Sequence, residues 1–392
     1  MILNDVLRND PGIREASADF ESAKNRIEQS RSAHWPKIVA TGIQPISQDH
    51  RSDDTTSKNF EPGLSAEFNL YSFGAIEFDI EKNRHNAEYY RYKLVEKYEE
   101  TAYDIILLYL DALRDKKAIE VLKKSLQRHI NILKDLSSII LHDKGRESEY
   151  VQANARKLLV EQQMNSRRLA LETTLSKIST FTQNSIRDDN IDDVFDISTI
   201  GDILIKYENN IKLNNPSYMA QQENLESKKM ELISEQKSAL PKLDINGTIT
   251  RNNKEISINL KWDLFNRSTS FNIDEKINQV AAASGRFDYI VRQIDESRKL
   301  SEITIKQTIK DIYILRKQIK ESERVVDFYK LQFQIARKTL IEVLNSQNEL
   351  SNVELQYVES QHRLNRGVLD FLRSQGGIMK WCCSNTNHNF KK

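Results

Sequence analysis

The chain has 392 residues and a net charge of +1, with 39% hydrophobic and 29% charged residues. This balance, without a run of lysines and arginines, excludes the basic footprint of a nucleic-acid-binding protein and is typical of long solvated helices with a narrow apolar stripe. The two cysteines, Cys382 and Cys383, are adjacent and build neither a disulfide framework nor a metal site. No stretch of about 18 apolar residues is present, so no transmembrane helix is predicted.

The first elements along the chain are a helix and a β-hairpin. Apolar residues recur every three or four positions within 12–34, which predicts a helix that ends before Pro36. Strands follow at 37–44 and 64–70, the second of which alternates apolar and polar side chains. These two strands predict a β-hairpin at 37–72.

A long helical hairpin is predicted next, at 76–183. Apolar residues keep a helical period through this stretch except at 142–145, where the chain can reverse. Residues 184–201 then break the period with two pairs of aspartates. A calcium loop would need a glycine and a terminal glutamate that are missing, so the favoured interpretation of 184–201 is a solvated connector.

The second half of the chain repeats this order. A helix is predicted at 216–238, followed by a β-hairpin at 242–265 in which apolar and polar residues alternate strictly. A second helical hairpin is predicted at 272–373, with its turn near Ala336. The tail at 376–392 begins with two glycines and is predicted to be disordered.

The two halves are copies of one unit. Asp10-Pro11 recurs 205 positions later as Asn215-Pro216, and further on Phe68 to Tyr71 meets Trp262 to Phe265 at an offset of 194. The first copy therefore has eleven extra residues, which fit best as a surface loop within 47–58. We divide the chain into a first structural repeat at 1–183, a connector at 184–215, a second repeat at 216–375 and a C-terminal tail at 376–392.

No motif for catalysis or for a cofactor is present. The seven histidines are scattered, and the sequence has no HExxH, no nucleophile elbow, no phosphate-binding glycine loop and no CxxC pair. We expect no enzyme activity, no cofactor and no metal.

Both the strands and the helices leave a packing problem. Two hairpins cannot close a barrel, so their edges stay unpaired, although strands of about nine residues match a tilted bilayer crossing. Strict alternation fits a membrane barrel with an aqueous lumen, and it fits a half-buried soluble sheet, which the strand pattern alone favours. The long helices shift the weighting away from the soluble sheet. Two hairpins leave apolar stripes on their outer sides unburied, and self-association would bury them.

The motifs of the two halves, taken in order, resemble the TolC-like outer-membrane efflux protein family, the exit ducts of bacterial efflux pumps and type I secretion systems. The resemblance covers about residues 1–378. It rests on the helix-opening pairs Asp10-Pro11 and Asn215-Pro216, the helix ends Trp35-Pro36 and Leu240-Pro241 before strands with Gly42 and Gly247, the strand ends NLYSFG (69–74) and KWDLFN (261–266), and the segments 143–158 and 333–350 as hairpin tips.

The resemblance implies a mainly α fold with a small β part. The long helical hairpins of three chains would form a trimeric α-barrel in the periplasm, and four strands from each chain would join a 12-stranded transmembrane β-barrel. The segments 184–215 and after about 368 would form a belt around the tunnel. The implied partners are further copies of the chain (a homotrimer), a periplasmic adaptor (membrane fusion) protein, an inner-membrane ABC or proton-driven transporter and outer-membrane lipid, with no nucleic acid.

By position in the family's second tip, Lys338 and Glu342 would constrict the periplasmic entrance. A further acidic position falls on Asn345, so the double acidic ring of the family would be single here. A solvated carboxylate on a helix face is the alternative interpretation of Glu342. The expected adaptor-docking residues of the two tips are Gly145, Arg146, Ser148, Ala336, Arg337 and Thr339, with Ala336 in the place of the usual tip glycine.

The resemblance places the protein in the outer membrane of a Gram-negative bacterium, with a periplasmic extension. Met1 opens directly on ILNDVL without the regions of a signal peptide, so we predict that the chain begins internally or that the start codon is misplaced. The leading hypothesis is a passive duct for small molecules or unfolded protein. The alternative is a soluble coiled-coil scaffold without channel activity.

Overall fold

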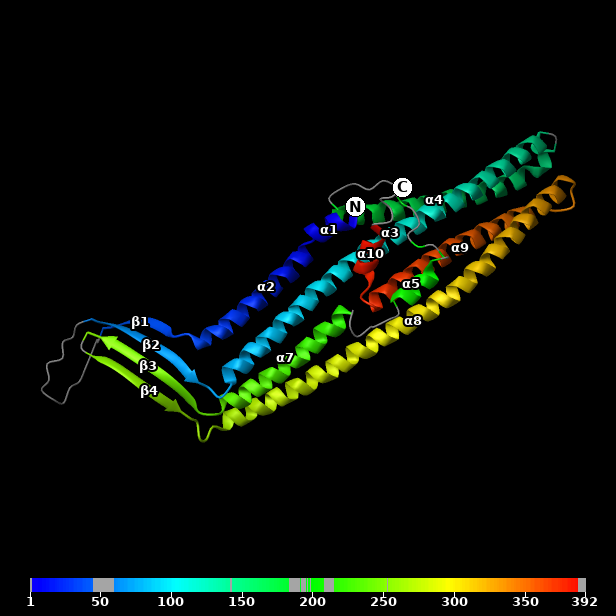
Figure 1. Cartoon of the computed structure of the whole chain (residues 1–392). Helices are drawn as coiled ribbons and strands as arrows, with labels where there is room; N and C mark the ends of the chain where they lie inside the picture. The colour runs from blue at the N-terminus through cyan, green and yellow to red at the C-terminus, as the bar shows by residue number, and fades with distance from the viewer. Residues whose placement is uncertain are drawn as a thin grey trace. The chain divides into compact units, whose positions relative to one another are not determined.

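The computed structural model describes residues 2–44, 60–141, 143–182, 191, 195, 197, 199–207, 215–251 and 253–386. The chain is mainly α with one small antiparallel sheet, which is the predicted fold class (Figure 1). The loop expected within 47–58 and the two aspartate pairs lie outside the described residues.

The helices and strands follow the predicted order, and both long helical hairpins are present. The elements are α1 (Ile2–Asn9), α2 (Pro11–Arg31), a 3₁₀ turn (Ser32–His34), β1 (Lys37–Ile43), β2 (Glu61–Tyr71), α3 (Ala75–Ile140), a second 3₁₀ turn (Lys144–Arg146), α4 (Glu147–Thr182), α5 (Ile200–Tyr207), α7 (Pro216–Ser238), β3 (Lys242–Thr250), β4 (Lys254–Lys261), α8 (Arg267–Gln334), α9 (Leu340–Ser374) and α10 (Ile378–Thr386).

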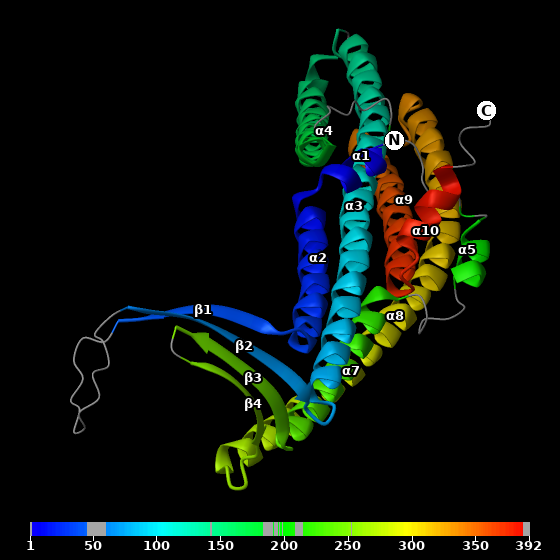
Figure 2. The ribbon, with the colours of Figure 1, turned by 60° about the vertical axis from the view of Figure 1, so that its left-hand side comes forward.

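The four strands form one sheet in the order β1-β2-β3-β4 (Figure 2). The expectation of two separated hairpins is wrong, because β2 pairs with β3 along its length, from Gly63 opposite Thr250 to Tyr71 opposite Leu243. All neighbours in the sheet are antiparallel. The strands β1 and β4 are the two edges of this sheet, so each has one side of its backbone that no described strand of the chain pairs with.

The chain separates into two compact units, each built from both halves of the sequence. Unit 1 comprises residues 1–13, 97–215 and 293–392, and unit 2 comprises residues 14–96 and 216–292. The division into sequence repeats is a different one and stays a prediction.

Unit 1 has cores of large apolar side chains. The main cluster joins α3, α5, α8, α9 and α10, with Leu110, Ile305 and Phe371 almost completely buried. The predicted disorder of the tail is wrong for α10, because Ile378 and Trp381 are buried and Trp381 stacks on Phe195 with ring centroids 4.8 Å apart.

The connector is also partly buried. Ile191, Phe195 and Ile200 are all at most 5% exposed, so the prediction of a solvated connector is wrong at these positions. Each of these side chains belongs to an apolar cluster of unit 1, which fixes this part of the chain against the long helices.

Unit 2 has a different interior. Among its described residues, the buried apolar side chains are Pro216 and four alanines. Small side chains let helix backbones approach closely but bury little apolar area. The four alanines are Ala23, Ala87, Ala220 and Ala283.

Candidate functional site

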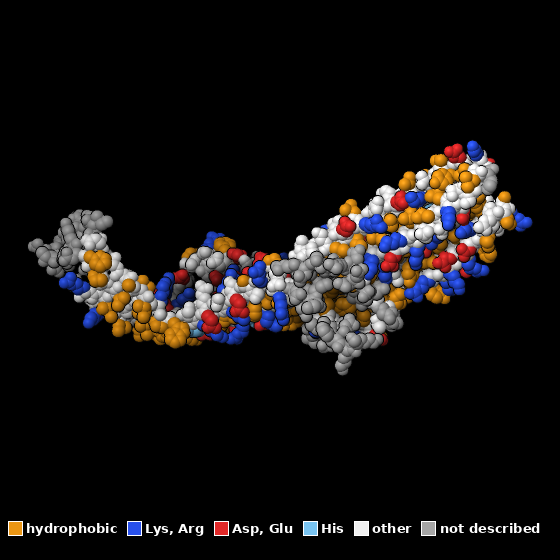
Figure 3. All heavy atoms as spheres, turned by 90° about the horizontal axis from the view of Figure 1, so that it is seen from above, with side chains coloured by type: hydrophobic (Ala, Val, Ile, Leu, Met, Phe, Trp, Pro, Cys, Tyr) orange, Lys and Arg blue, Asp and Glu red, His pale blue; other side chains and the backbone are white. Residues whose placement is uncertain are grey.

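The sheet of unit 2 presents apolar side chains to its surroundings. In β4, Ile256, Ile258 and Leu260 are 84%, 67% and 69% exposed, and they alternate with the polar Ser257 and Asn259. Figure 3 shows hydrophobic side chains gathered over the strands. A row of exposed apolar side chains of this kind marks an interaction surface.

Polar side chains line a hollow where the helices of unit 2 meet the strands. The hollow has a volume of about 720 Å³ and takes its walls from α2, α3, α7, β2 and β3. Asn69 Nδ2 donates to Asp244 Oδ1 at 2.6 Å across the β2–β3 pair, which satisfies two of the polar groups at its wall. The charged residues of the lining are Arg26, Glu67, Asp79, Lys82, Lys242 and Asp244.

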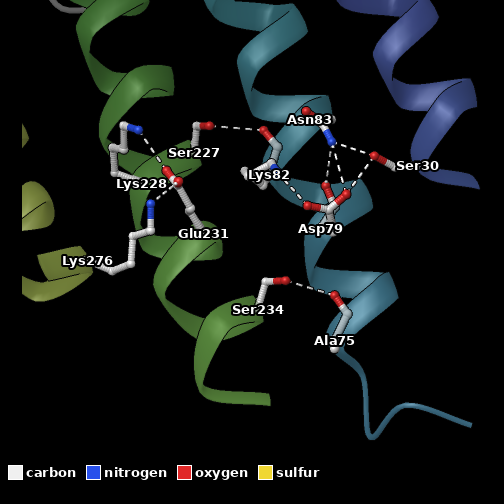
Figure 4. Close-up of polar contacts among 10 residues, drawn as sticks. All are labelled: Ser30, Ala75, Asp79, Lys82, Asn83, Ser227, Lys228, Glu231, Ser234 and Lys276. Carbon is white, nitrogen blue, oxygen red and sulfur yellow. Dashed lines mark hydrogen bonds and ion pairs between the residues drawn. The ribbon is translucent and has the colours of Figure 1, made fainter. Parts of the chain in front are cut away.

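Hydrogen bonds hold α2 and α7 on α3 beside this hollow (Figure 4). Ser30 of α2 donates to Asp79 Oδ2 of α3 at 2.7 Å. From α7, the hydroxyl of Ser234 donates to the carbonyl oxygen of Ala75 at 2.9 Å. These contacts hold together helices that bury little apolar area, and the sequence periodicity predicted the helices without predicting these bonds.

The second helical tip, between α8 and α9 in unit 1, turns at Ala336. This alanine has φ of 56°, in the left-handed region that favours glycine. The N–H of Arg337 donates to the carbonyl oxygen of Gln332 at 2.9 Å, which closes the end of α8. The glycine expected here from the resemblance is absent, and the alanine in its place adopts a conformation that glycine would adopt more readily.

Two of the predicted entrance residues of this tip contact each other. Lys338 Nζ lies 2.6 Å from Glu342 Oε1 and 4.4 Å from the ring centroid of Tyr329. Glu342 Oε2 accepts from both the backbone N–H and the hydroxyl of Thr339, each at 2.9 Å, as in the reciprocal part of a capping box. Asn345 is exposed, one turn further along α9.

The bond from Lys338, followed by those from Thr339, lowers the pKa of Glu342 from 4.5 to about 2. This carboxylate therefore organises the first turn of α9, and its place at a periplasmic entrance stays a prediction.

The first tip, between α3 and α4, is organised differently. Asp143 Oδ1 accepts from the N–H of Gly145 at 3.0 Å, and no positive φ occurs at this glycine. Arg146 lies with its guanidinium 5.8 Å from the ring centroid of Phe333, a residue of the second tip. Ser148 is exposed in the first turn of α4.

Both tips rest on one apolar cluster. Leu136 of α3 and Ala153 of α4 come from the first hairpin, and Leu340, Val343 and Leu344 of α9 come from the second. All five are at most 2% exposed. The structure thus brings the predicted residues of the two tips to one end of unit 1.

The polar groups inside unit 1 have no signal in the sequence pattern. Glu99 is 7% exposed and accepts the backbone N–H groups of Ile378 at 2.9 Å and of Met379 at 3.2 Å, at the start of α10. Burial raises the pKa of Glu99, although these two bonds and Lys380 act in the opposite direction. Glu99 lies in the apolar stripe of α3, where the helical period predicts an apolar residue.

No described group of histidine, cysteine or acidic side chains has the composition of a metal site. No described helix is both long enough and apolar enough to cross a membrane.

The fold is that of known outer-membrane channels. VceC of Vibrio cholerae superposes with a TM-score of 0.84 at 13% identity, over 96% of this chain and 95% of that one. The CmeC outer membrane channel of Campylobacter jejuni gives a TM-score of 0.82 at 16% identity, over 96% and 85% of the two chains. The MtrE outer membrane channel of Neisseria gonorrhoeae gives 0.73 at 12% identity, over 96% and 88%. At these identities the likeness is one of fold.

The family resemblance has separate support from sequence. Residues 2–134 match the family model described as outer membrane efflux protein. No curated protein matches the chain. The resemblance to the outer-membrane efflux proteins is therefore confirmed, by the match of residues 2–134 to the family model and by a similar fold over 96% of the chain.

Proposed function

We propose that this chain is the subunit of a passive outer-membrane exit duct in a tripartite efflux or type I secretion system. The observation that carries the proposal is a four-stranded sheet with an exposed apolar face, continuous in sequence with helices whose interior in unit 2 is polar and thin. A sheet of this kind is stable when its apolar face meets lipid and its edges meet other strands. Three copies supply twelve strands, enough to close a barrel.

The duct needs no chemistry of its own. The polar face of the sheet and the hollow lined by Glu67, Asp79 and Asp244 provide a wet surface along which cargo passes without a tight site. Cargo is either small molecules or unfolded protein, and an inner-membrane ABC or proton-driven transporter supplies the energy. The location is the outer membrane of a Gram-negative bacterium, with outer-membrane lipid against the apolar face.

The helical tips form the periplasmic entrance in this proposal. Lys338, Glu342 and Asn345 of three copies constrict the opening, with Lys338 and Glu342 already paired within each chain. The adaptor docks on the tips at the residues around Gly145 and Ala336. These are Gly145, Arg146, Ser148, Ala336, Arg337 and Thr339, of which Arg146 is half-buried and Gly145, Ser148, Ala336, Arg337 and Thr339 are exposed.

Membrane fractionation of the full-length gene product, combined with chemical cross-linking, tests the function. We expect heat-resistant trimers in the outer-membrane fraction, and greater accumulation of efflux substrates in cells that lack the protein. Recovery of a detergent-independent monomer or dimer in the soluble fraction would instead identify the soluble coiled-coil scaffold and refute the duct.

A further inference from the structure

The two β-hairpins carry different charges at the same position of their register. In the first hairpin, Lys37 of β1 lies opposite Glu67 of β2. Adding the sequence offsets of 205 and 194 to these numbers gives Lys242 of β3 and Lys261 of β4, which lie opposite each other in the second hairpin. The register of the two hairpins is therefore the same, and a pair of opposite charges in the first is a pair of like charges in the second.

Like charges at directly opposite positions of an antiparallel strand pair are unfavourable. The Cβ atoms of such positions lie about 4.5–5.5 Å apart on one face of the sheet, so the two ammonium groups repel each other. Within the part of the chain that the structure describes, Lys242 and Lys261 form no hydrogen bond or ion pair with an acid. An anion that binds to both lysines would relieve this repulsion through charge-assisted hydrogen bonds.

The two lysines lie on the polar face of the sheet. Lys242 lines the hollow of about 720 Å³ where the helices of unit 2 meet the strands. Because directly opposite residues of an antiparallel pair share a face, Lys261 lies on the same face as Lys242. Leu243 and Leu260, which also lie opposite each other, are on the other face. The lysine pair therefore faces the wet side of the sheet and not its apolar side.

Each acid that lines the hollow already has a group of its own chain beside it. Asp79 pairs with Lys82 (Figure 4). Asp244 Oδ1 accepts from Asn69 Nδ2 at 2.6 Å. Glu67 lies opposite the lysine that begins β1. These contacts reduce the negative charge that the hollow presents to a ligand.

The cations of the hollow are less engaged than its acids. Besides Lys242, the exposed Arg26 of α2 lines the hollow, and it forms no hydrogen bond or ion pair with any described residue. Ala75 and Ile76, the first residues of α3, also line it, and the N-terminal end of a helix carries partial positive charge. Three elements thus direct positive charge into one space, whose volume is within the range of about 300–1,000 Å³ for sites that bind small organic molecules.

We propose that Lys242 and Lys261, together with Arg26, form a weak binding subsite for the carboxylate, sulfonate or phosphate group of a small organic anion. The two lysines donate charge-assisted hydrogen bonds to the oxygens of the anion, and Arg26 adds a third positive charge at the wall of the hollow. The rest of the hollow takes the organic part of the molecule. The inference rests on the duct of the proposed function and gives its cargo a chemical class.

A soluble small anion fits this subsite better than the phosphate of a lipid. The exposed apolar side chains of β4, such as Ile256 and Ile258, mark the face that lipid would cover, and the lysine pair is on the opposite face. Lys242 and Lys261 are both exposed to solvent, so their contacts with an anion are screened and weak. Weak binding suits a duct, because cargo that is held tightly would not leave it.

Titration of the full-length protein, purified in a nonionic detergent, with para-fluorobenzoate tests the subsite, and fluorine NMR of this probe measures its affinity. Lys261→Glu restores the opposite-charge pair of the first hairpin, and we expect it to weaken binding by about tenfold, because a repelling charge replaces an attracting one. Lys261→Gln removes the attraction alone and should weaken binding by a smaller factor, about threefold. We expect para-fluorobenzylammonium, which has the same ring and the opposite charge, not to bind to the wild type.

The matched control makes the same charge change at the other end of β4. Lys254 lies opposite Ile249 on the apolar face of the sheet, so Lys254→Glu should leave the affinity for para-fluorobenzoate unchanged. The reverse change, Glu67→Lys, copies the lysine pair onto the first hairpin, opposite Lys37, and should add one further bound probe molecule per chain. Retention of the heat-resistant trimer shows that each variant is folded.

The outcomes separate the subsite from the duct. Trimers that conduct ions across a planar lipid bilayer, but bind para-fluorobenzoate equally in wild type and Lys261→Glu, would overturn the subsite and leave the duct intact. Equal binding of para-fluorobenzylammonium, or an equal loss in Lys254→Glu, would also overturn the subsite. Binding that depends on Lys261, in a protein that forms no trimer and conducts no ions, would support the subsite and refute the duct.

Discussion

The two helical tips of unit 1 solve the same problem with different residues. The first tip has a glycine, Gly145, without a left-handed backbone, and an aspartate side chain that accepts its N–H. The second has an alanine, Ala336, in the left-handed conformation, followed by a threonine and a glutamate that organise the next helix. A glycine at a turn therefore does not by itself mean that the backbone there is left-handed. Hydrogen bonds from neighbouring residues can hold an alanine in a left-handed conformation that it disfavours.

The largest effect should come from removing the apolar support that the tips share. Leu344 is completely buried between the two hairpins, so Leu344→Ala should destabilise the tips by about 2–5 kcal/mol through lost burial and a residual cavity. Hydrogen exchange of backbone amides in both tips measures this, and exchange should accelerate at residues near Gly145 as well as near Ala336. The control is Ile341→Ala, because the side chain of Ile341, on the same helix, is 39% exposed. Acceleration at the second tip alone would show that the tips open independently.

The next effect should come from the hydroxyl at the start of α9. Thr339→Ala removes the donor to Glu342 Oε2 and should weaken the second tip by about 1 kcal/mol, whereas Thr339→Ser should keep the bond. Exchange of the first amides of α9, relative to those of α4, reports the difference. Equal exchange in the two variants would mean that the backbone N–H of Thr339 suffices to hold the carboxylate.

Relieving the left-handed alanine should act in the opposite direction. A residue other than glycine in the left-handed conformation costs about 1–2 kcal/mol, which glycine would relieve. Glycine also makes the unfolded chain more flexible, and this offsets about 0.5–1 kcal/mol of the relief. Ala336→Gly should therefore stabilise the second tip by several tenths of a kcal/mol up to about 1 kcal/mol. Slower amide exchange around residue 336 checks it, and faster exchange would show that the observed φ is not the source of strain.

The pH dependence of the two tips should also differ. The pKa of Glu342 is lowered from 4.5 to about 2, so its ionised form stabilises the second tip fully above pH 4.5, and this contribution is lost as the pH falls toward about 2. Glu342→Gln should abolish this dependence. Exchange at the second tip, divided by exchange at the first tip at the same pH, removes the intrinsic effect of acid. A ratio that changes equally in wild type and variant would assign the dependence to another group.

The smallest effect is expected at Gly145, the glycine of the first tip. Gly145 has no left-handed φ, and an added Cβ would meet only the side-chain oxygen of Asp143 at 3.2 Å. Gly145→Ala should change the stability of the first tip by less than about 0.5 kcal/mol. Amide exchange at the start of α4 measures the free energy of local opening. A decrease of more than about 1 kcal/mol would contradict this prediction and would show that both tips depend on their central residue.

The sequence predicts those parts of the fold that depend on local periodicity. The long helices follow from apolar residues at a spacing of three and four, and the strand β4 follows from the alternation of Ile256, Ile258 and Leu260. The sequence also predicts the turn at Ala336, because the second helical hairpin needs a reversal there.

Features that depend on distant residues were not predictable in this way. The pairing of Gly63 with Thr250 joins two hairpins that each satisfy the same local pattern alone. The burial of Phe195 and Trp381 arises from their contact with each other and with long helices, and short segments rich in polar residues give no periodic signal for it. Of the tip residues, Lys338 precedes α9, so its contact with Glu342 does not follow from helical spacing, and neither does the left-handed φ of Ala336.

The equal register of the two hairpins bears on how such a protein diversifies. In the ring of the proposed function, a half-length ancestor with one hairpin of strands would carry every substitution six times, so a change that suits one partner would be imposed on all positions. Fusing two copies that keep the same register, with Lys37 opposite Glu67 and Lys242 opposite Lys261, lets each half mutate alone while still fitting its neighbours. In the proposed trimer, the glycine of one tip and the left-handed alanine of the other each occur at three places instead of six, which is the kind of difference that two separate halves allow.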